Sequence, residues 1–338
     1  MLRFPDRPDA LPLNLIWNFG TTSSIWTMID KRSYTIRNYF RDDFDKYFQL
    51  QVESEQLEPA GRFISAQGLS DYLGRPNFTP QKDLFIAELN ENLVGWLSLS
   101  LEPGIGRVLL DGLVHPLHRC KGIASQLFAS GLQRIKESGI MSAQVSLSET
   151  NAPARGFLNR QGFAFIRYFF EMRLNIASTR LPAARQGLTA SRRLKNGEEA
   201  LLTELQNRCF GDSWGFNPNT TEEIAYRLNM RGRGPGDVTL TFLENKPVGY
   251  CWTIIDAEAN AKRKKNKGLI HMMGVDPDYR QQEIGKAILL NGLRDLKDSG
   301  VDTVELTVDS ENPAACSLYE SVGFAVYAKT EWYERILD

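Results

Sequence analysis

In the first half of the chain, segments whose apolar positions repeat with the period of a β-strand are followed by segments whose apolar positions repeat with the period of an α-helix. Apolar runs on either side of Asn90-Glu91-Asn92 predict a β-hairpin, and an apolar face that ends at Gly139 predicts a helix with a glycine stop. The predicted strands are residues 32–39, 83–89, 93–101, 108–114, 143–147 and 163–174, and the predicted helices are residues 42–53, 123–138 and 152–160.

The second half repeats this series. Asp83 and Asp237 are 154 residues apart (237 − 83), and Val114 and Val275 are 161 apart (275 − 114). The difference of seven (161 − 154) falls before Val275, where residues 256–267 are interpreted as a solvated hairpin loop with a basic run. The repeated strands are residues 237–243, 246–255, 269–275 and 303–308, and the repeated helices are residues 284–299 and 313–321.

This duplication predicts an α+β protein with two tandem domains, each a mixed, mostly antiparallel sheet flanked by helices. A length of 338 residues fits two cores better than one. We expect the first domain to cover residues 1–178, with residues 1–30 as an N-terminal extension, and the second to cover residues 187–338. Residues 179–186 have little periodicity and one proline, so they are the predicted linker.

The composition excludes several classes of protein. A formal net charge of −1, with 24% charged residues, argues against binding to nucleic acid or to an anionic membrane through the overall field. The four cysteines are far apart and the three histidines lack metal-ligand spacing, so we expect neither a disulfide framework nor a metal site. Because no secretory signal or membrane-spanning run is recognisable, the expected protein is a cytoplasmic monomer or weak homodimer.

The loop after the strand 108–114 has the features of a phosphate cradle. A loop that enters a helix points unpaired backbone N–H groups at one place, and the helix dipole adds positive potential. Gly122 lets a ligand approach the backbone without a Cβ in the way, while Arg119 and Lys121 add charge. A similar loop, with one change, follows Val275. Each repeat therefore contains a candidate pyrophosphate site.

The first loop, Val-His-Pro-Leu-His-Arg-Cys-Lys-Gly-Ile-Ala over residues 114–124, resembles the signature of the GNAT superfamily of acetyl-CoA-dependent N-acetyltransferases. Residues 274–324 are similar to the catalytic half of a tandem member of this superfamily. The resemblance implies acetyl-CoA as cosubstrate and a small-molecule amine as acceptor. The residues that it implies for CoA are Leu113, Val114, Arg119, Cys120, Lys121, Gly122, Ile123, Ala124 and Asn151 in the first repeat, and Met273, Gly274, Val275, Arg280, Gln281, Gln282, Ile284, Gly285 and Asn312 in the second.

Each repeat departs from the family pattern once. Glu283 stands where the first repeat has Gly122 (283 − 161 = 122), and a carboxylate there competes with a phosphate for the N–H groups. Tyr319 matches the tyrosine that in many members protonates the departing CoA thiolate, whereas the first repeat has Leu158 at that position (319 − 161 = 158). We therefore expect the second repeat to be the catalyst and the first to hold CoA more tightly.

Acetyl transfer to an amine needs a base for the ammonium proton and an acid for the leaving thiolate. Tyr319 is the expected acid. The resemblance implies Glu258 as the base, with Asp256 as the alternative, because residues 252–258 resemble a segment that contributes a glutamate in the tandem family member. Asp111 interrupts the strand before the first cradle, where many members place a base or a water-orienting group. For Glu258 and Asp111, a solvent-facing carboxylate is the alternative interpretation.

The sequence thus predicts an N-acetyltransferase that transfers acetyl directly to a primary amine of a small molecule. Two alternatives stay open. One is acetylation of a protein or peptide amine, which needs an open groove. The other is a CoA-sensing or scaffold protein without turnover, because each repeat lacks one expected element. His115, His118 and His271 are interpreted as ordinary surface or loop histidines.

Overall fold

The computed structural model describes residues 34–60, 65–182 and 189–337. The expected extension 1–30 and residues 183–186 of the expected linker lie outside this part of the chain. The chain divides into two compact units. Of the described residues, the first contains 34–60, 65–73, 78–99 and 111–138, and the second contains 74–77, 100–110, 139–182 and 189–337.

The first unit is built on antiparallel strands, in which β1 pairs with β2 and β2 pairs with β3. Helices α1 and α2 bury Tyr47 and Leu69 against Trp96 on one face of these strands. Helix α4 covers the other face at Gly131, where a Cβ would come within 2.8 Å of Leu97 Cδ2. The elements are β1 (Thr35–Asn38), α1 (Phe44–Leu57), α2 (Ala66–Leu73), α3 (Pro80–Asp83), β2 (Leu84–Leu89), β3 (Asn92–Glu102), β4 (Arg107–Val114) and α4 (Ile123–Glu137).

The second unit contains the first half of β4 (residues 107–110) and the strands that follow in the order β4-β5-β12-β6-β11-β10-β9-β8-β7. Its strands are β5 (Ser142–Ser148), β6 (Ala164–Asn175), β7 (Thr189–Arg193), β8 (Val238–Leu243), β9 (Lys246–Ile254), β10 (Lys267–Val275), β11 (Thr303–Asp309) and β12 (Ala325–Ile336). Its helices are α5 (Ala152–Arg160), α6 (Glu199–Phe210), α7 (Thr221–Leu228), α8 (Ala257–Arg263), α9 (Ile284–Asp298) and α10 (Pro313–Glu320).

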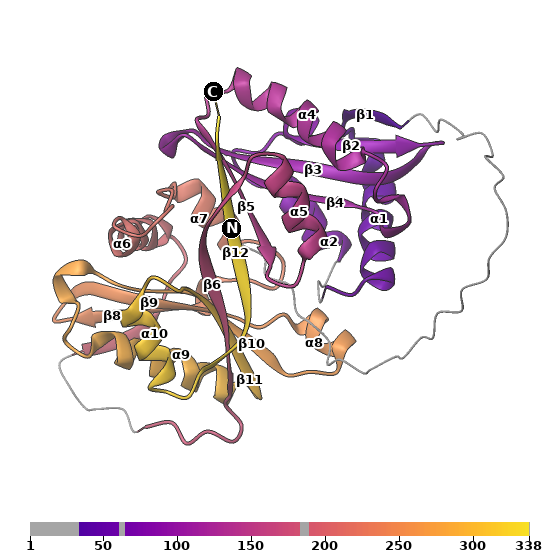
Figure 1. Ribbon diagram of the computed structural model, residues 1–338. Coiled ribbons are helices and arrows are strands. Elements are labelled where there is room, and N and C mark those ends of the chain that lie inside the picture. The colour runs from indigo at the N-terminus through magenta and orange to yellow at the C-terminus, as the bar shows by residue number, and fades with distance from the viewer. Residues whose placement is uncertain (1–33, 61–64, 183–188, 338) are drawn as a thin grey trace. The chain divides into compact units, whose positions relative to one another are not determined.

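The two repeats exchange their last strands. Strand β6, the last of the first repeat, pairs with β11 of the second, with Met172 opposite Leu306. Strand β12, the last of the second repeat, runs between β5 and β6, with Glu331 opposite Leu147 (Figure 1). Arg155 of the first repeat also forms an ion pair of 2.9 Å with Glu331. The compact units therefore do not follow the predicted repeats, because strands from both repeats build the middle of one sheet.

Helices cover both faces of the strands in the second repeat. Helices α9 and α10 share a core with Val248, Cys251 and Leu306 on one face. Helices α6 and α7 share another core with Tyr250 and Trp252. Cys251 and Trp252 are consecutive on β9, and successive side chains of a strand point to opposite faces. The two faces of β9 therefore pack against two different hydrophobic cores.

Most predicted elements of both repeats form at the expected positions, such as α5 over residues 152–160. Residues 256–267 are an exception. They were expected to be a hairpin loop, but residues 257–263 form helix α8. The reason is local, since Asp256 Oδ1 accepts a hydrogen bond of 2.9 Å from the Ala259 N–H and three alanines favour the helix.

Candidate active site

The first cradle is a strand-to-helix loop with two left-handed residues. Strand β4 ends at Val114, and Cys120 and Gly122 then adopt φ values of 59° and 80° before α4 begins. Arg119 is held inside the loop, because its Nε donates to the Val114 carbonyl at 3.2 Å and its Nη1 donates to Glu58 Oε2 at 2.5 Å. Lys121 Nζ donates to the Leu117 carbonyl. Both cations therefore stay at the loop.

The first loop fits a pyrophosphate. Within the part of the chain that the structure describes, the backbone N–H groups of residues 119–125 have no acceptor. These donors include the first turn of α4, where the helix dipole favours an anion. The space beside Gly122 is open, since the nearest atom to a Cβ built there is Gln126 Nε2 at 3.8 Å.

The second loop has the same backbone conformation. Gln281 and Glu283, the counterparts of Cys120 and Gly122, have φ values of 64° and 61°. Arg280 Nε points at the Val275 carbonyl at 3.4 Å, and its Nη1 donates to Asp212 Oδ2 at 2.6 Å. This repeats the anchoring of the first arginine. The hydrogen bond from Arg280 lowers the pKa of the Asp212 carboxyl.

Strand β10, which precedes the second loop, pairs with β11 along only part of its length. Strands β10 and β11 pair in parallel only from Lys267 to Leu269, whereas β9 stays paired with β10 as far as Val275. The pairing register of β10 with β9 also shifts around His271. Among the described residues, no strand therefore pairs with the second edge of residues 270–275 beside the loop. Such an edge can hold an extended chain such as the pantetheine arm of CoA.

Tyr319 lies on α10, in the core beside this strand. Its side chain is only 7% exposed, and its ring meets Phe324 at 5.9 Å between centroids. Its hydroxyl has no hydrogen-bond partner among the described residues, and burial raises its pKa, so the phenol stays protonated at neutral pH. Leu158 occupies the matching place in the first repeat, because Phe163 N–H donates to the Leu158 carbonyl as Phe324 N–H donates to that of Tyr319.

Both repeats match the profile of the acetyltransferase (GNAT) family, over residues 35–163 and 200–324. The chain belongs to this family. It is similar to the mycothiol acetyltransferases of Stackebrandtia nassauensis (27% identity, covering 76% of this chain and 84% of the relative) and Thermobispora bispora (32%, covering 66% and 74%).

Solved structures of GNAT proteins share the fold. A GCN5-related N-acetyltransferase from Sphaerobacter thermophilus has a TM-score of 0.70 at 18% identity, with 91% of this chain and 97% of that chain covered. A tandem GNAT protein from the clavulanic acid biosynthesis pathway has a TM-score of 0.66 at 17% identity, with 90% and 98% covered. The tandem GNAT architecture is thereby confirmed, and the protein is an acetyl-CoA-dependent acetyltransferase.

The structure shows no contact between Tyr319 and the predicted bases among the described residues. Glu258 is exposed on α8, beyond the point where Ile254 of β9 pairs with Leu269, and no described contact joins it to Tyr319. Asp256 caps α8. Asp111 is exposed on β4. Its counterpart Met272 accepts a hydrogen bond from Gln206 Nε2.

The two asparagines predicted to bind CoA both cap helices. Asn151 Oδ1 accepts a hydrogen bond of 3.2 Å from Ala154 N–H at the start of α5, and Asn312 Oδ1 accepts one of 3.0 Å from Ala315 N–H at the start of α10. Each side-chain oxygen is therefore engaged by the protein, which leaves the amide NH₂ of each side chain for a ligand.

His271 is not an ordinary surface or loop histidine. It lies half-buried in β10, with its ring 5.3 Å from that of Trp252, and burial lowers its pKa to about 3. Sequence reasoning also missed helices α2 and α7, which have the same length and begin 155 residues apart (221 − 66).

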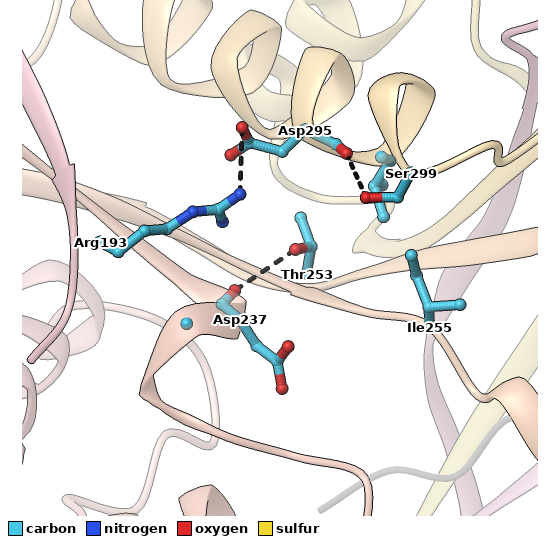
Figure 2. A pocket seen from close by; sticks show the side chains of 8 residues that line it. Arg193, Asp237, Thr253, Ile255, Asp295 and Ser299 are labelled. Atoms are coloured by element: carbon cyan, nitrogen blue, oxygen red, sulfur yellow. Dashed lines mark hydrogen bonds and ion pairs between the residues drawn. The ribbon is translucent and has the colours of Figure 1, made fainter. Parts of the chain in front are cut away.

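A cavity of about 160 Å³ lies at the end of α9 that is remote from the cradle. Figure 2 shows Arg193 directed at Asp295, and the two form an ion pair of 3.1 Å. Asp237 lines the same cavity, and burial raises the pKa of its carboxyl. Because Asp295 and Ser299 belong to the C-terminal end of α9, this cavity is distinct from the pyrophosphate site.

None of the described helices combines the length and apolar character that crossing a bilayer requires. No group of three or more His, Cys, Asp or Glu side chains in the described part of the chain is arranged to hold a metal ion. Cys120, Cys209, Cys251 and Cys316 are free thiols in the structure.

Proposed function

We propose that the second repeat transfers the acetyl group of acetyl-CoA directly to a primary amine of a small molecule. The observation that carries this proposal is Tyr319, a buried phenol whose hydroxyl has no partner in the described part of the chain. Its neighbour Leu318 approaches the first turn of α9, within 3.5 Å of a Cβ built at Gly285. The similarity to mycothiol acetyltransferases supports a small acceptor.

In this proposal each side chain has a separate task. Arg280 and the N–H groups at the start of α9 hold the pyrophosphate, and the free edge of β10 holds the arm that carries the thioester. Glu258 takes one proton from the ammonium, after which the neutral amine nitrogen forms a bond to the acetyl carbon and the C–S bond breaks. Tyr319 Oη donates its proton to the departing sulfur, and the second proton lost by the nitrogen returns through solvent to the tyrosinate.

The first repeat is proposed to hold CoA without turnover. Gly122 leaves its cradle open, whereas Leu158 has no proton to give. A bound nucleotide there stabilises the folded chain by mass action. The proposed chemistry and the tighter binding thus belong to different repeats.

Separate Gly122→Glu and Tyr319→Phe variants test this division. Calorimetry with acetyl-CoA counts the occupied cradles, and thiol release over a library of primary amines measures turnover. We expect Gly122→Glu to remove one binding event while turnover continues, and Tyr319→Phe to keep both binding events while turnover falls. If Gly122→Glu abolished turnover and Tyr319→Phe left it unchanged, the active repeat would be the first.

A CoA-sensing protein without turnover is the second candidate, and Glu283 favours it. Its carboxylate stands at the N-terminus of α9, where it repels a phosphate. The same assay separates the candidates, because an enzyme releases thiol with at least one amine of the library. A sensor binds acetyl-CoA and releases none.

A further inference from the structure

The segment that follows α6 connects the second cradle to other strands of the sheet, and we call its residues 211–216 the anchor loop. Arg280 of the cradle binds the start of this segment, because its Nη1 donates to Asp212 Oδ2 at 2.6 Å and its Nη2 donates to the Cys209 carbonyl at 2.7 Å. Its Nε points at the Val275 carbonyl at 3.4 Å. Arg280 therefore ties the backbone of the cradle to the anchor loop.

The ion pair between Arg280 and Asp212 cannot fix the anchor loop by itself. The two side chains are 39% and 60% exposed. An exposed ion pair contributes little to stability, because water screens its charges and the ordering of two flexible side chains costs entropy. The anchor loop must therefore be fixed from another side for Asp212 to stay in place.

Trp214 packs the middle of the anchor loop on strands β6 and β12. Its ring centroid lies 4.2 Å from Arg167 Cζ and 5.7 Å from the ring centroid of Trp332. Phe169 contacts the same ring, with 6.2 Å between centroids. These contacts restrain the indole, since aromatic rings prefer such tilted and T-shaped arrangements. They do not fix the direction of the backbone carbonyl that follows Trp214.

Arg107, at the start of β4, fixes that carbonyl. Its Nη2 donates to the Gly215 carbonyl at 2.6 Å, a charge-assisted hydrogen bond. Only 6% of Arg107 is exposed, and its other donors bind Glu102 Oε2 at 2.6 Å and Gln144 Oε1 at 3.1 Å. Because two further partners hold the planar guanidinium, its Nη2 keeps one direction. This end of the anchor loop is therefore held more firmly than the exposed end at Asp212.

Gly215 allows the anchor loop to approach Arg107 this closely. Its φ is +63°, in the left-handed region, and a Cβ built there would collide with Arg107 Nη1. Backbone strain and the guanidinium thus both exclude a side chain at this position. The contact needs a glycine in the second repeat and an arginine in the first.

The first repeat has alanine where the anchor loop has tryptophan. Glu58 takes the place of Asp212 as partner of the cradle arginine. Two residues further on, the first repeat has Ala60 and the second has Trp214 (58 + 2 and 212 + 2). The stronger anchoring therefore belongs to the cradle that contains Glu283. A cradle weakened in this way gains most from a loop fixed in advance, because preorganisation lowers the entropy cost of binding.

We infer that Arg107 is a positioning residue for the second cradle, since its hydrogen bond to Gly215 sets the loop through which Asp212 holds Arg280. All four residues belong to the second compact unit. The first repeat thus supplies a residue that supports CoA binding by the second. This inference rests on the proposed function in one respect, namely that the second cradle binds CoA.

Calorimetry with acetyl-CoA tests this role in the Gly122→Glu background, where the first cradle is closed and the remaining binding event belongs to the second. Gly215→Ala should raise the dissociation constant roughly 3- to 10-fold, the effect of losing about one hydrogen bond. Gly197→Ala is the matched control and should leave the dissociation constant unchanged. Gly197 has a φ of +84° and no described atom within 4 Å of a Cβ built there, so the variant has similar strain without a collision.

Combination with Asp212→Asn separates positioning from a general loss of stability. Asp212→Asn should by itself raise the dissociation constant by a similar factor. Because Arg107 acts through Asp212, Gly215→Ala should add less than about twofold in the Asp212→Asn protein. At saturating acetyl-CoA, kcat should stay at the level of the Gly122→Glu protein. Full multiplication of the two effects, or an unchanged dissociation constant in Gly215→Ala, overturns the inference.

Amide hydrogen exchange gives a readout that does not need bound CoA. Without ligands, Gly215→Ala should speed exchange at residues 280–284 of the second cradle, and Gly197→Ala should not. Equal exchange at these residues in the parent protein and both variants overturns the inference. Faster exchange in Gly215→Ala, together with no binding event in the Gly122→Glu protein, overturns the proposed function instead and supports the positioning role.

Discussion

Glu283 adopts the left-handed conformation of Gly122 at the equivalent position of the second cradle, with φ of 61° against 80°. Glycine reaches this region without strain, whereas a residue with a Cβ is held there at a cost of about 1 kcal/mol or more. The loop has therefore kept its shape in spite of the substitution. A retained cradle shape is expected of a site that still binds a ligand.

The variant Glu283→Gly should stabilise the protein and tighten the second cradle for acetyl-CoA. The free energy of unfolding should rise by about 1 kcal/mol, because strain at a positive φ is relieved. The dissociation constant of the weaker site should fall, since a carboxylate no longer competes for the N–H groups. Urea denaturation and calorimetry measure the two effects. Gln281→Gly relieves similar strain without changing charge, so an equal gain in affinity from that control would contradict the electrostatic explanation.

Tyr319→Phe should lower kcat by about 10²- to 10⁴-fold, the usual contribution of a general acid, and leave the KM for acetyl-CoA unchanged. The melting temperature should not fall, because the described structure gives the hydroxyl no partner and the ring keeps its contact with Phe324. Steady-state thiol release and a thermal melt provide the measurements. A large loss of stability with unchanged kcat would assign Tyr319 to the core alone.

Glu258→Gln tests the proposed base. Because Glu258 is exposed, its replacement should leave the melting temperature unchanged while kcat falls at least about a hundredfold. Glu222→Gln, an exposed change in the first turn of α7, is a control that should have wild-type kinetics. Retention of full kcat by Glu258→Gln would show that another group takes the proton.

His271 should make the protein less stable as the pH falls. In the folded chain its pKa is about 3, against an ordinary value of 6.5, so between these values the unfolded chain binds one proton more. The contribution is complete above pH 6.5 and is lost progressively toward pH 3, by up to about 1.4 kcal/mol per pH unit. Urea midpoints of His271→Gln should depend less on pH across this window. Parallel pH profiles for wild type and variant would contradict the depressed pKa.

The repeat in the sequence was enough to predict both cradles, because equal spacing of Val114 and Val275 from their arginines fixes equivalent loops. The strand exchange could not be predicted in the same way. An alternating strand such as β12 specifies which of its faces is buried, and it does not specify which strand lies beside it. The division into domains at residues 179–186 therefore stays a prediction.

The buried polar atoms of β9 escaped sequence reasoning for a different reason. Tyr250 and Trp252 are at most 1% exposed. Whether a buried polar atom has a partner can be seen only when every neighbour is placed. Helix α8 was not predicted, because the basic run in residues 256–267 indicated a solvated loop and the helix-capping potential of Asp256 was not considered.

The position of β12 has a consequence for synthesis of the protein. The ribosome makes this strand after all the other described strands, yet it lies between β5 and β6 of the earlier repeat. A nascent chain therefore cannot pair the facing edges of β5 and β6 before Ile336 has been synthesised. A premature stop codon before Ala325 would expose the edges of β5 and β6 together. Although the sequence contains two repeats, the first repeat needs the last strand of the second to join its own last two strands.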